Sequence, residues 1–427
     1  MLLLYSDNPS SRLAYTCKVI FENLCDVDYR LTVSLEDYSA HRGPKINYSD
    51  VELEGLQIVP CGLLGESGIG WKTPEHSVYR NFPVLFPNKG KLLPFDVLAS
   101  VFYMISRYEE YQNHRGDNYG RFRPEDSIAL KLNILDKACV NRWVIFLVDQ
   151  LNLLFPSSIE GIKKDRAEFS IDIDNAYAYK HKSAVRTVAS MITSTFKPSE
   201  FIDRLYVHAG LRPDPYDNYE FLEKAFSVIN TQVKFFILCS KYGPFDKNIS
   251  FKSPAFLGLI QRLKKWAAVG IHPSFASNKD KSAHMEKSIL ENLMQEEVSI
   301  SRQHYLMFHL PETYRGLIEM GIKSDYSMGY SNAHGYRAGI SVPFPFYDLE
   351  AECQTSLILH PFQFMDAMYI HHVPEGQKKA KIHVDGLLQE WNETGGGIHF
   401  VFHNEYVNNK KQGDWREFLA TIISKTR

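Results

Sequence analysis

Strand-like and helix-like segments alternate from residue 167 to the C-terminus, and this alternation limits the possible folds more than any other feature of the sequence. Strands that alternate with helices favour a parallel sheet, because each helix carries the chain back to the start of the next strand. Seven strands are predicted, at residues 168–173, 233–239, 268–272, 298–302, 324–328, 356–360 and 398–402.

The segments between these strands have the periodicity of amphipathic helices. Seven strand–helix units in this length of chain match the size of a closed β/α barrel, which needs about 250 residues. We therefore predict a β/α barrel over residues 166–427, with an open doubly wound sheet as the alternative. Helices are predicted at residues 255–266, 281–297, 311–320 and 415–423.

Residues 1–165 have a different texture and are predicted to form a separate, smaller α/β domain. Short strands, at the N-terminus and at residues 56–60, are interrupted by Gly and Pro, and a helix is expected at residues 97–111. The polar aromatic loop 117–123 is interpreted as a packing surface, and residues 161–166 as a linker. Because no Asp, His or Cys cluster follows a predicted strand here, we expect no catalytic group from this part.

The composition is that of a globular protein: 44% of the 427 residues are hydrophobic and 23% are charged. Lys and Arg (48) nearly balance Asp and Glu (50), so no overall field attracts nucleic acid. No apolar segment is as long as the hydrophobic core of a signal peptide, and none approaches the length of about 20 residues that a membrane-spanning helix needs. The six cysteines are scattered, as unpaired thiols are in a reducing compartment. We expect a cytoplasmic protein without nucleic-acid partners or membrane insertion.

Two carboxylates follow the first strand of the C-terminal part. Asp172 and Asp174 are two residues apart, a spacing that places both side chains on one face of a strand. Two like charges at a core-facing position are costly unless a cation or a shared proton compensates for them. The sequence therefore indicates a cation or proton site here, with a helix-capping turn at Asp174 as the alternative.

Polar side chains also end three other strands. His272 ends the strand 268–272 and is well placed to ligate a metal through neutral imidazole, although a lone His in such a position is more often structural. Arg302 and His304 follow the next strand, and His403 follows the last. Because the carboxyl ends of parallel strands meet at one edge, this combination is typical of metal-assisted hydrolysis.

These motifs resemble the polysaccharide deacetylase superfamily, the NodB-homology enzymes of carbohydrate esterase family 4. The resemblance rests on Ser-Ile-Asp-Ile-Asp (170–174), Gly-Ile-His-Pro-Ser (270–274), Arg-Gln-His (302–304) and Phe-His (402–403). It covers residues 167–427 and is closest to a bacterial branch with an additional α/β domain before the barrel. It implies a distorted, seven-stranded β/α barrel.

The resemblance implies that Asp172 is the catalytic base and Asp174 a metal ligand. The commoner pattern has adjacent aspartates, so the assignment within the pair stays open. His272 matches the first of two family histidines four residues apart, but Ala276 occupies the second position. His304 is the first candidate for the replacement ligand; Ser277 and His360 are further candidates, and a water is another.

The remaining implied roles concern the base, the acid and the substrate. Arg302 resembles the arginine that orients the base, and His403 the general acid that protonates the leaving amine. Asp366 is expected to orient His403 or to contact substrate. Tyr336 and Arg337 are expected to contact substrate, with anchoring of the loop 325–330 as the alternative for Arg337.

The function predicted from the resemblance is a metal-dependent hydrolase that cleaves the amide C–N bond of an N-acetylated sugar or glycan. Its cofactor is expected to be one divalent ion, zinc, and its partner an N-acetylated carbohydrate. The alternative is a non-catalytic carbohydrate-binding or scaffold protein, for which Ala276 is the main support. Hydrolysis of another amide or an ester is a further alternative, and the oligomeric state is left open.

Overall fold

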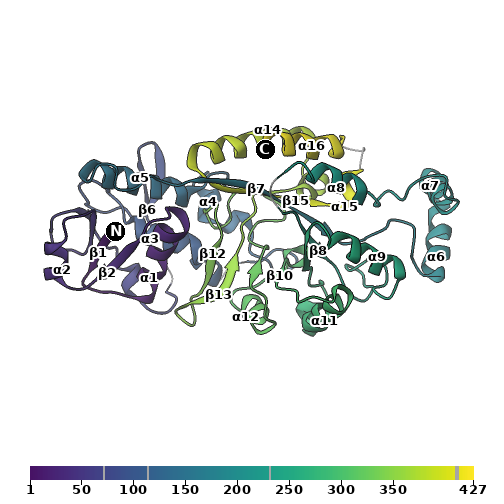
Figure 1. Ribbon diagram of the computed structural model, residues 1–427, viewed down its shortest axis with the longest axis horizontal. Helices are drawn as coiled ribbons and strands as arrows, with labels where there is room; N and C mark the ends of the chain where they lie inside the picture. Colours follow the sequence, from purple (N-terminus) through teal and green to yellow (C-terminus); the bar gives the residue numbers. More distant parts are fainter. Residues whose placement is uncertain (71–72, 113–114, 230–231, 409–412) are drawn as a thin grey trace.

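The computed structural model describes residues 1–427 except 71–72, 113–114, 230–231 and 409–412. The chain forms an α/β structure with two main sheets (Figure 1). The smaller sheet has the order β2-β1-β3-β4, and all its strands are parallel. Its strands are β1 (Leu2–Ser6), β2 (Tyr29–Thr32), β3 (Lys45–Tyr48) and β4 (Leu56–Ile58), and a separate hairpin consists of β5 (His76–Tyr79) and β6 (Phe82–Leu85).

Helices with well-defined N-caps surround the smaller sheet. Ser10 caps α1 through a hydrogen bond from the Leu13 N–H (3.0 Å), and Asp96 caps α3 through the Ala99 N–H (2.9 Å). The prediction of one helix over 97–111 is wrong in its second half. Helix α3 ends at Ile105 because Arg107 adopts a left-handed backbone conformation, with φ 55°. The helices are α1 (Ser11–Cys17), α2 (Leu35–Ala40), α3 (Val97–Ile105), α4 (Ile128–Lys131) and α5 (Cys139–Leu154).

The larger sheet has nine strands in the order β12-β13-β11-β10-β9-β8-β7-β15-β14. Each of the seven predicted strand segments overlaps one of them, while β12 and β14 are additional, so the predicted number was too low. All neighbouring strands are parallel except the antiparallel pair β12–β13. The strands are β7 (Lys164–Ile173), β8 (Lys234–Ile237), β9 (Ala268–Ile271), β10 (Ile300–Ser301), β11 (Ser324–Asp325), β12 (Phe344–Asp348), β13 (Cys353–Leu359), β14 (Phe364–Met365) and β15 (Gly396–His403).

The larger sheet is strongly curved. Arg302, which follows β10, donates hydrogen bonds to Ser170 Oγ (2.7 Å) and Asp172 Oδ1 (2.8 Å) on β7. Because β8 and β9 lie between these strands, a flat sheet would separate β7 and β10 by about 14 Å. The curvature brings side chains of the inner face together. Among the described residues no backbone pairing joins β12 to β14, so closure into a barrel is not observed.

Helices connect the strands close to their predicted positions (Figure 1). Two boundaries differ for a local reason. Strand β11 stops at Asp325, because the Oδ1 atom of Asp325 accepts the Ser327 N–H (2.9 Å) in a side-chain turn. The second half of the predicted linker 161–166 is strand, because β7 begins at Lys164. The helices are α6 (Ala184–Ser194), α7 (Pro198–His208), α8 (Tyr219–Phe226), α9 (Pro254–Leu263), α10 (Ser277–Asp280), α11 (Ala283–Met294), α12 (Glu312–Glu319), α13 (Asp366–His371), α14 (Gly376–Thr394), α15 (Asn404–Val407) and α16 (Trp415–Lys425).

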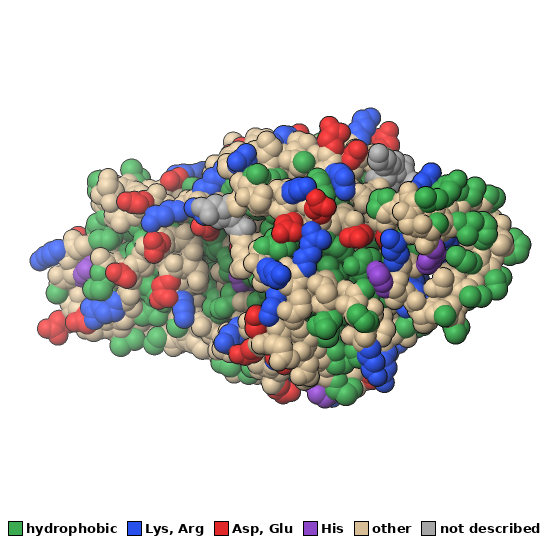
Figure 2. Space-filling view, turned by 45° about the vertical axis from the view of Figure 1, so that its right-hand side comes forward, with side chains coloured by type: hydrophobic (Ala, Val, Ile, Leu, Met, Phe, Trp, Pro, Cys, Tyr) green, Lys and Arg blue, Asp and Glu red, His purple; other side chains and the backbone are tan. Residues whose placement is uncertain are grey.

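The two sheets share one hydrophobic core, which contains Leu4 of β1 and Ile171 of β7. Polar contacts reinforce the junction: Asn141 Nδ2 on α5 donates to Ser341 Oγ (2.7 Å). The division into domains at residue 165 stays a prediction. Helices α6 and α7 lie at one end of the molecule (Figure 1), where hydrophobic side chains gather at the surface (Figure 2). Within the described ranges, no helix combines the length and the apolar character that crossing a bilayer requires.

Candidate metal centre

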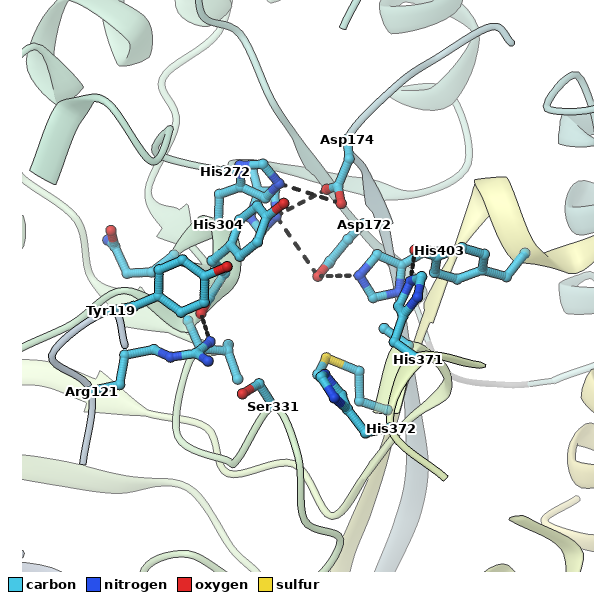
Figure 3. A pocket seen from close by; sticks show the side chains of 16 residues that line it. Tyr119, Arg121, Asp172, Asp174, His272, His304, Ser331, His371, His372 and His403 are labelled. Carbon is cyan, nitrogen blue, oxygen red and sulfur yellow. Dashed lines mark hydrogen bonds and ion pairs between the residues drawn. The ribbon is translucent and has the colours of Figure 1, made fainter. Parts of the chain in front are cut away.

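A cavity of about 340 Å³ lies at the carboxyl ends of the central strands of the larger sheet. The side chains of Asp172, Asp174, His272, His304 and His403 point into it (Figure 3). These residues follow or end β7, β9, β10 and β15, so the sheet collects them from four segments far apart in the sequence. The expected convergence of these strand ends is therefore observed.

Asp174, His272 and His304 form a compact group of three possible metal ligands. The Asp174 Oδ1 atom lies 3.2 Å from His272 Nε2, and Oδ2 lies 3.4 Å from His304 Nε2. One ligand atom from each residue lies within 4.8 Å of the other two. Two ligand atoms of a tetrahedral zinc site are about 3.4 Å apart, given metal–ligand distances of about 2.0–2.1 Å. The spacing therefore fits one ion.

One oxygen atom in this group also points to a cation. Asp174 Oδ1 is buried and accepts no regular hydrogen bond from the described residues; its nearest neighbour is His272 Nε2 at 3.2 Å. A buried carboxylate oxygen without a regular hydrogen bond is costly, whereas a bound cation would compensate its charge. The ligand set present thus fits a divalent ion that accepts both nitrogen and oxygen ligands.

The two histidines are oriented by hydrogen bonds from their second ring nitrogen. His272 Nδ1 donates to the Arg302 carbonyl (2.5 Å), and His304 Nδ1 donates to Asp246 Oδ1 (3.0 Å). Both Nε2 atoms therefore face Asp174, and each can bind a metal once it carries no proton. Metal-binding histidines typically donate their other N–H to a carbonyl or carboxylate in this way.

Asp246 was not identified from the sequence, although it lies in the loop after β8. Its carboxylate also accepts the backbone N–H groups of Phe275 (2.9 Å) and Ala276 (3.1 Å). Ala276, which occupies the position of the expected family histidine, thus donates its backbone N–H to Asp246. Asp246 in turn accepts the hydrogen bond that orients His304. A carboxylate that follows a parallel strand was a signal that could have found it.

The charges in this group reinforce one another. Burial alone would raise the pKa of Asp174, but His304 and His272 outweigh it and hold that pKa well below its usual range. Burial likewise would lower the pKa of His304, but Asp174 and Asp246 raise it to about 9. The pKa of Asp246 is lowered, because the hydrogen bond from His304 and the backbone N–H groups outweigh burial.

Asp172 lies beside the three possible ligands but has different partners. Its Oδ1 accepts Arg302 Nη1 (2.8 Å), while Oδ2 lies 3.9 Å from His272 Nε2 and 3.8 Å from His403 Nε2. The guanidinium of Arg302 is fully buried and also donates from Nε to the Tyr326 carbonyl (2.9 Å). Asp172 is therefore fixed through one oxygen, and its other oxygen faces the cavity.

His403 is held by the carboxylate of Asp366. Its Nδ1 donates to Asp366 Oδ1 (2.6 Å) and its backbone N–H to Oδ2 (2.8 Å). Burial would lower the pKa of His403, but Asp366 raises it to about 10. Asp366 is buried behind His403 and does not line the cavity. It is therefore placed to orient His403, as one of the two expectations stated, and not to contact substrate.

The expectation that Arg337 and Tyr336 contact substrate is not supported, because neither side chain lines this cavity. The Arg337 guanidinium is buried and donates to both oxygens of Glu110 (2.9 and 2.6 Å) and to the Gly329 carbonyl (2.9 Å). It anchors the loop 325–330, as the alternative proposed. Tyr336 is buried beneath the surface.

Two further candidates for the third ligand are also placed elsewhere. Ser277 Oγ donates to the Ser274 carbonyl (2.7 Å). His360 stacks on Tyr326, with the ring centroids 4.1 Å apart, and it lines a different cavity. The structure leaves His304 as the nearest imidazole to His272 and Asp174.

The N-terminal part contributes a section of the cavity wall that the sequence did not indicate. Tyr119 and Arg121 belong to the loop interpreted as a packing surface, yet they line the cavity (Figure 3). The Tyr119 ring packs against Tyr305 and Phe275, with centroids 5.8 Å apart in both cases. Arg121 donates to the Tyr305 carbonyl. His371 also lines the wall.

Comparisons with known proteins give limited information. A family of unknown function (DUF7033) matches residues 2–156. No curated protein sequence matches the chain.

Several solved structures resemble part of the chain, among them the following three. The first, described as a polysaccharide deacetylase from Mycobacterium smegmatis, is 14% identical, with a TM-score of 0.39 over 61% of this chain and 82% of that one. The second is Puue allantoinase (10% identical, TM-score 0.39, 61% and 83% covered). The third is described as a polysaccharide deacetylase from Pseudomonas aeruginosa PAO1 (11% identical, TM-score 0.38, 61% and 83% covered). At this level of similarity we draw no conclusion about activity from them.

Proposed function

We propose that this protein is a metal-dependent hydrolase that removes the N-acetyl group from an N-acetylated carbohydrate. The observation that carries the proposal is the convergence of Asp174, His272 and His304 on one point, with Asp172 and His403 beside them. This set contains a metal site, a candidate base and a candidate acid, which are the groups that amide hydrolysis requires.

Asp174, His272 and His304 would hold the ion, for which zinc suits the mixed nitrogen and oxygen ligands. When bound, such an ion polarises a carbonyl oxygen and lowers the pKa of a water molecule. The hydrogen bonds of His272 to the Arg302 carbonyl and of His304 to Asp246 support this assignment, because they keep both Nε2 atoms available.

Asp172 would act as the general base. Among the described residues, its Oδ2 pairs only with His403 (3.8 Å) and His272 (3.9 Å) and faces the cavity, so it can accept a proton from the attacking water. Arg302 would position this carboxylate, since the bond from Nη1 to Oδ1 (2.8 Å) fixes the side chain without occupying Oδ2. These contacts favour Asp172 as the base and Asp174 as the ligand.

His403 would act as the general acid. An amine leaves poorly as an anion, so a proton must reach the amide nitrogen as the C–N bond breaks. Asp366 supports this role, because it orients the ring through Nδ1 and raises the pKa of the imidazolium. The Nε2–H of His403 then lies on the cavity side, 3.8 Å from Asp172 Oδ2.

A carbohydrate is the substrate class that the wall of the cavity supports best. Tyr119 and Tyr305 are each 37–38% exposed at its rim, beside polar side chains. Partly exposed aromatic rings offer an apolar surface with a polar tip, which suits a sugar ring with both apolar and hydroxyl-bearing faces. The motifs that resemble the deacetylase superfamily lead to the same substrate class.

The proposal is tested with the purified chain, stripped of metal and reloaded with zinc, in an assay of acetate release from a panel of N-acetylated sugars and oligosaccharides. We expect His304→Ala to lose both metal and activity, and Asp172→Asn to lose activity while keeping metal. His284→Ala, which changes an exposed histidine on α11, is the matched control and should behave like the unmodified chain. Sugar binding without acetate release under any metal would instead support the carbohydrate-binding alternative.

A further inference from the structure

Helices α6 and α7 turn their apolar side chains toward solvent. On α6, Val185, Val188 and Ile192 follow the spacing i, i+3, i+7, so they form one stripe, and all three are exposed. Phe196, between the two helices, is 88% exposed. The corresponding stripe on α7 contains Ile202 and Leu205.

Some polar side chains of this helical hairpin lie on its inner side, whereas others, such as Thr193 and Ser199, are exposed. Arg204 Nη1 on α7 donates to Ser190 Oγ on α6 (2.9 Å), and Ser194 is buried. No α6 side chain belongs to a hydrophobic core cluster of the described residues. The apolar stripe of α6 therefore faces solvent, whereas the apolar stripe of a helix packed on a core is buried. A contiguous apolar surface of this kind indicates a binding site.

The hairpin and its flanks are cationic, although the whole chain has a net charge of −2. Residues 180–212 contain six Lys and Arg but only two Asp and Glu. Both acids are paired within the segment, Glu200 with Arg204 and with Lys197 (3.7 Å), and Asp203 with Arg212. Burial and, to a smaller extent, repulsion from Arg186 and Arg204 lower the pKa of Lys182 to about 8.

A second copy of the chain is disfavoured as the occupant of this surface. An isologous contact would bring two segments of the same positive charge together. The surface is also a projecting end of the molecule rather than a groove (Figures 1 and 2). A projecting tip with an apolar stripe and cationic flanks suits an anionic lipid surface, into which such a helix sinks by about 5–10 Å.

We propose that the α6–α7 hairpin binds the surface of an anionic membrane, with Val188, Ile192 and Phe196 in the acyl region and Lys197 at the headgroups. Lys197 follows Phe196 in the sequence and is 73% exposed, with its Nζ 3.7 Å from Glu200 Oε2. Its long side chain can reach the headgroup level. In this contact the hairpin lies in the interface of one leaflet and does not span the bilayer.

Co-sedimentation of the full chain with vesicles tests the proposal. We expect binding to vesicles that contain phosphatidylglycerol, weaker binding to phosphatidylcholine alone, and release at high salt. The double variant Ile192→Asp/Phe196→Asp should reduce partitioning about a hundredfold or more, because each of the two large apolar side chains contributes at least about tenfold. Lys197→Glu should reduce it by roughly fivefold or more.

Ile382→Asp is the matched control, because Ile382 is 62% exposed on α14, outside the hairpin. It should bind vesicles like the unmodified chain. All replaced side chains are exposed, and circular dichroism checks that each variant is folded. Absence of vesicle binding at low salt overturns the proposal. So does a dimer in sedimentation velocity that Ile192→Asp/Phe196→Asp dissociates, since a second copy would then cover the surface.

Discussion

Asp246 offers a specific test of how the metal site is built. Its carboxylate accepts three hydrogen bonds, from His304 Nδ1 and from the backbone N–H groups of Phe275 and Ala276. In Asp246→Asn, either orientation of the amide places its NH₂ group opposite at least one of these donors, and the negative charge is lost. His304 would then be held less firmly and would be a weaker ligand.

The size of the effect follows from the position of Asp246. Replacing a group that orients a metal-binding histidine lowers metal affinity about 10–100-fold, which corresponds to about 1.4–2.7 kcal/mol. We expect the lower end for Asp246→Asn, because one amide orientation keeps an acceptor for His304. Asp246→Ala removes all three acceptors and should reach the upper end.

The assay is a competition between the protein and a chelator of known zinc affinity. Asp280→Asn is the control, because Asp280 is an exposed carboxylate at the end of the nearby helix α10. It should bind zinc like the unmodified chain. Unchanged zinc affinity in both Asp246 variants would refute the role of Asp246. Unchanged affinity in His304→Ala as well would refute the three-ligand site.

Three further predictions use the same chain. Asp172→Asn should lower acetate release by about 10²–10⁴ without loss of zinc, because it removes the base but no ligand; zinc lost with activity would make Asp172 a ligand. Because Asp366 raises the pKa of His403 to about 10, the acid form persists through neutral pH and the rate should fall only above about pH 10; in Asp366→Asn this decline should begin at lower pH, and an unshifted pH–rate profile would contradict the assignment. Burial raises the pKa of Asp325 to about 6; the folded state then binds more protons than the unfolded state between about pH 4 and 6, so the free energy of unfolding should fall by on the order of 3 kcal/mol as the pH rises through this window. Thermal unfolding of Asp325→Asn should lose that dependence, and an identical pH profile would contradict the prediction.

The sequence was sufficient to locate seven of the nine strands of the larger sheet and several of the polar residues at their ends. Both inferences depend on local patterns: alternating segment types predict parallel strands, and parallel strands bring their carboxyl ends to one edge. Asp172, Asp174, His272 and His403 could therefore be grouped before any contact was known. Their chemical roles are proposals that rest on this grouping and on the resemblance.

Other features depended on contacts between segments that no local pattern connects. The sequence contained Asp246 and Tyr119, but their distance from His304 depends on how two loops fold over a curved sheet. Arg337 was expected to contact substrate or to anchor a loop. In the structure its guanidinium is buried and forms an ion pair with Glu110, which lies 227 residues away in the sequence. Hydrophobic periodicity reports which face of one segment is buried, whereas the partner of a polar side chain is decided by tertiary packing, which brings distant residues within hydrogen-bond distance.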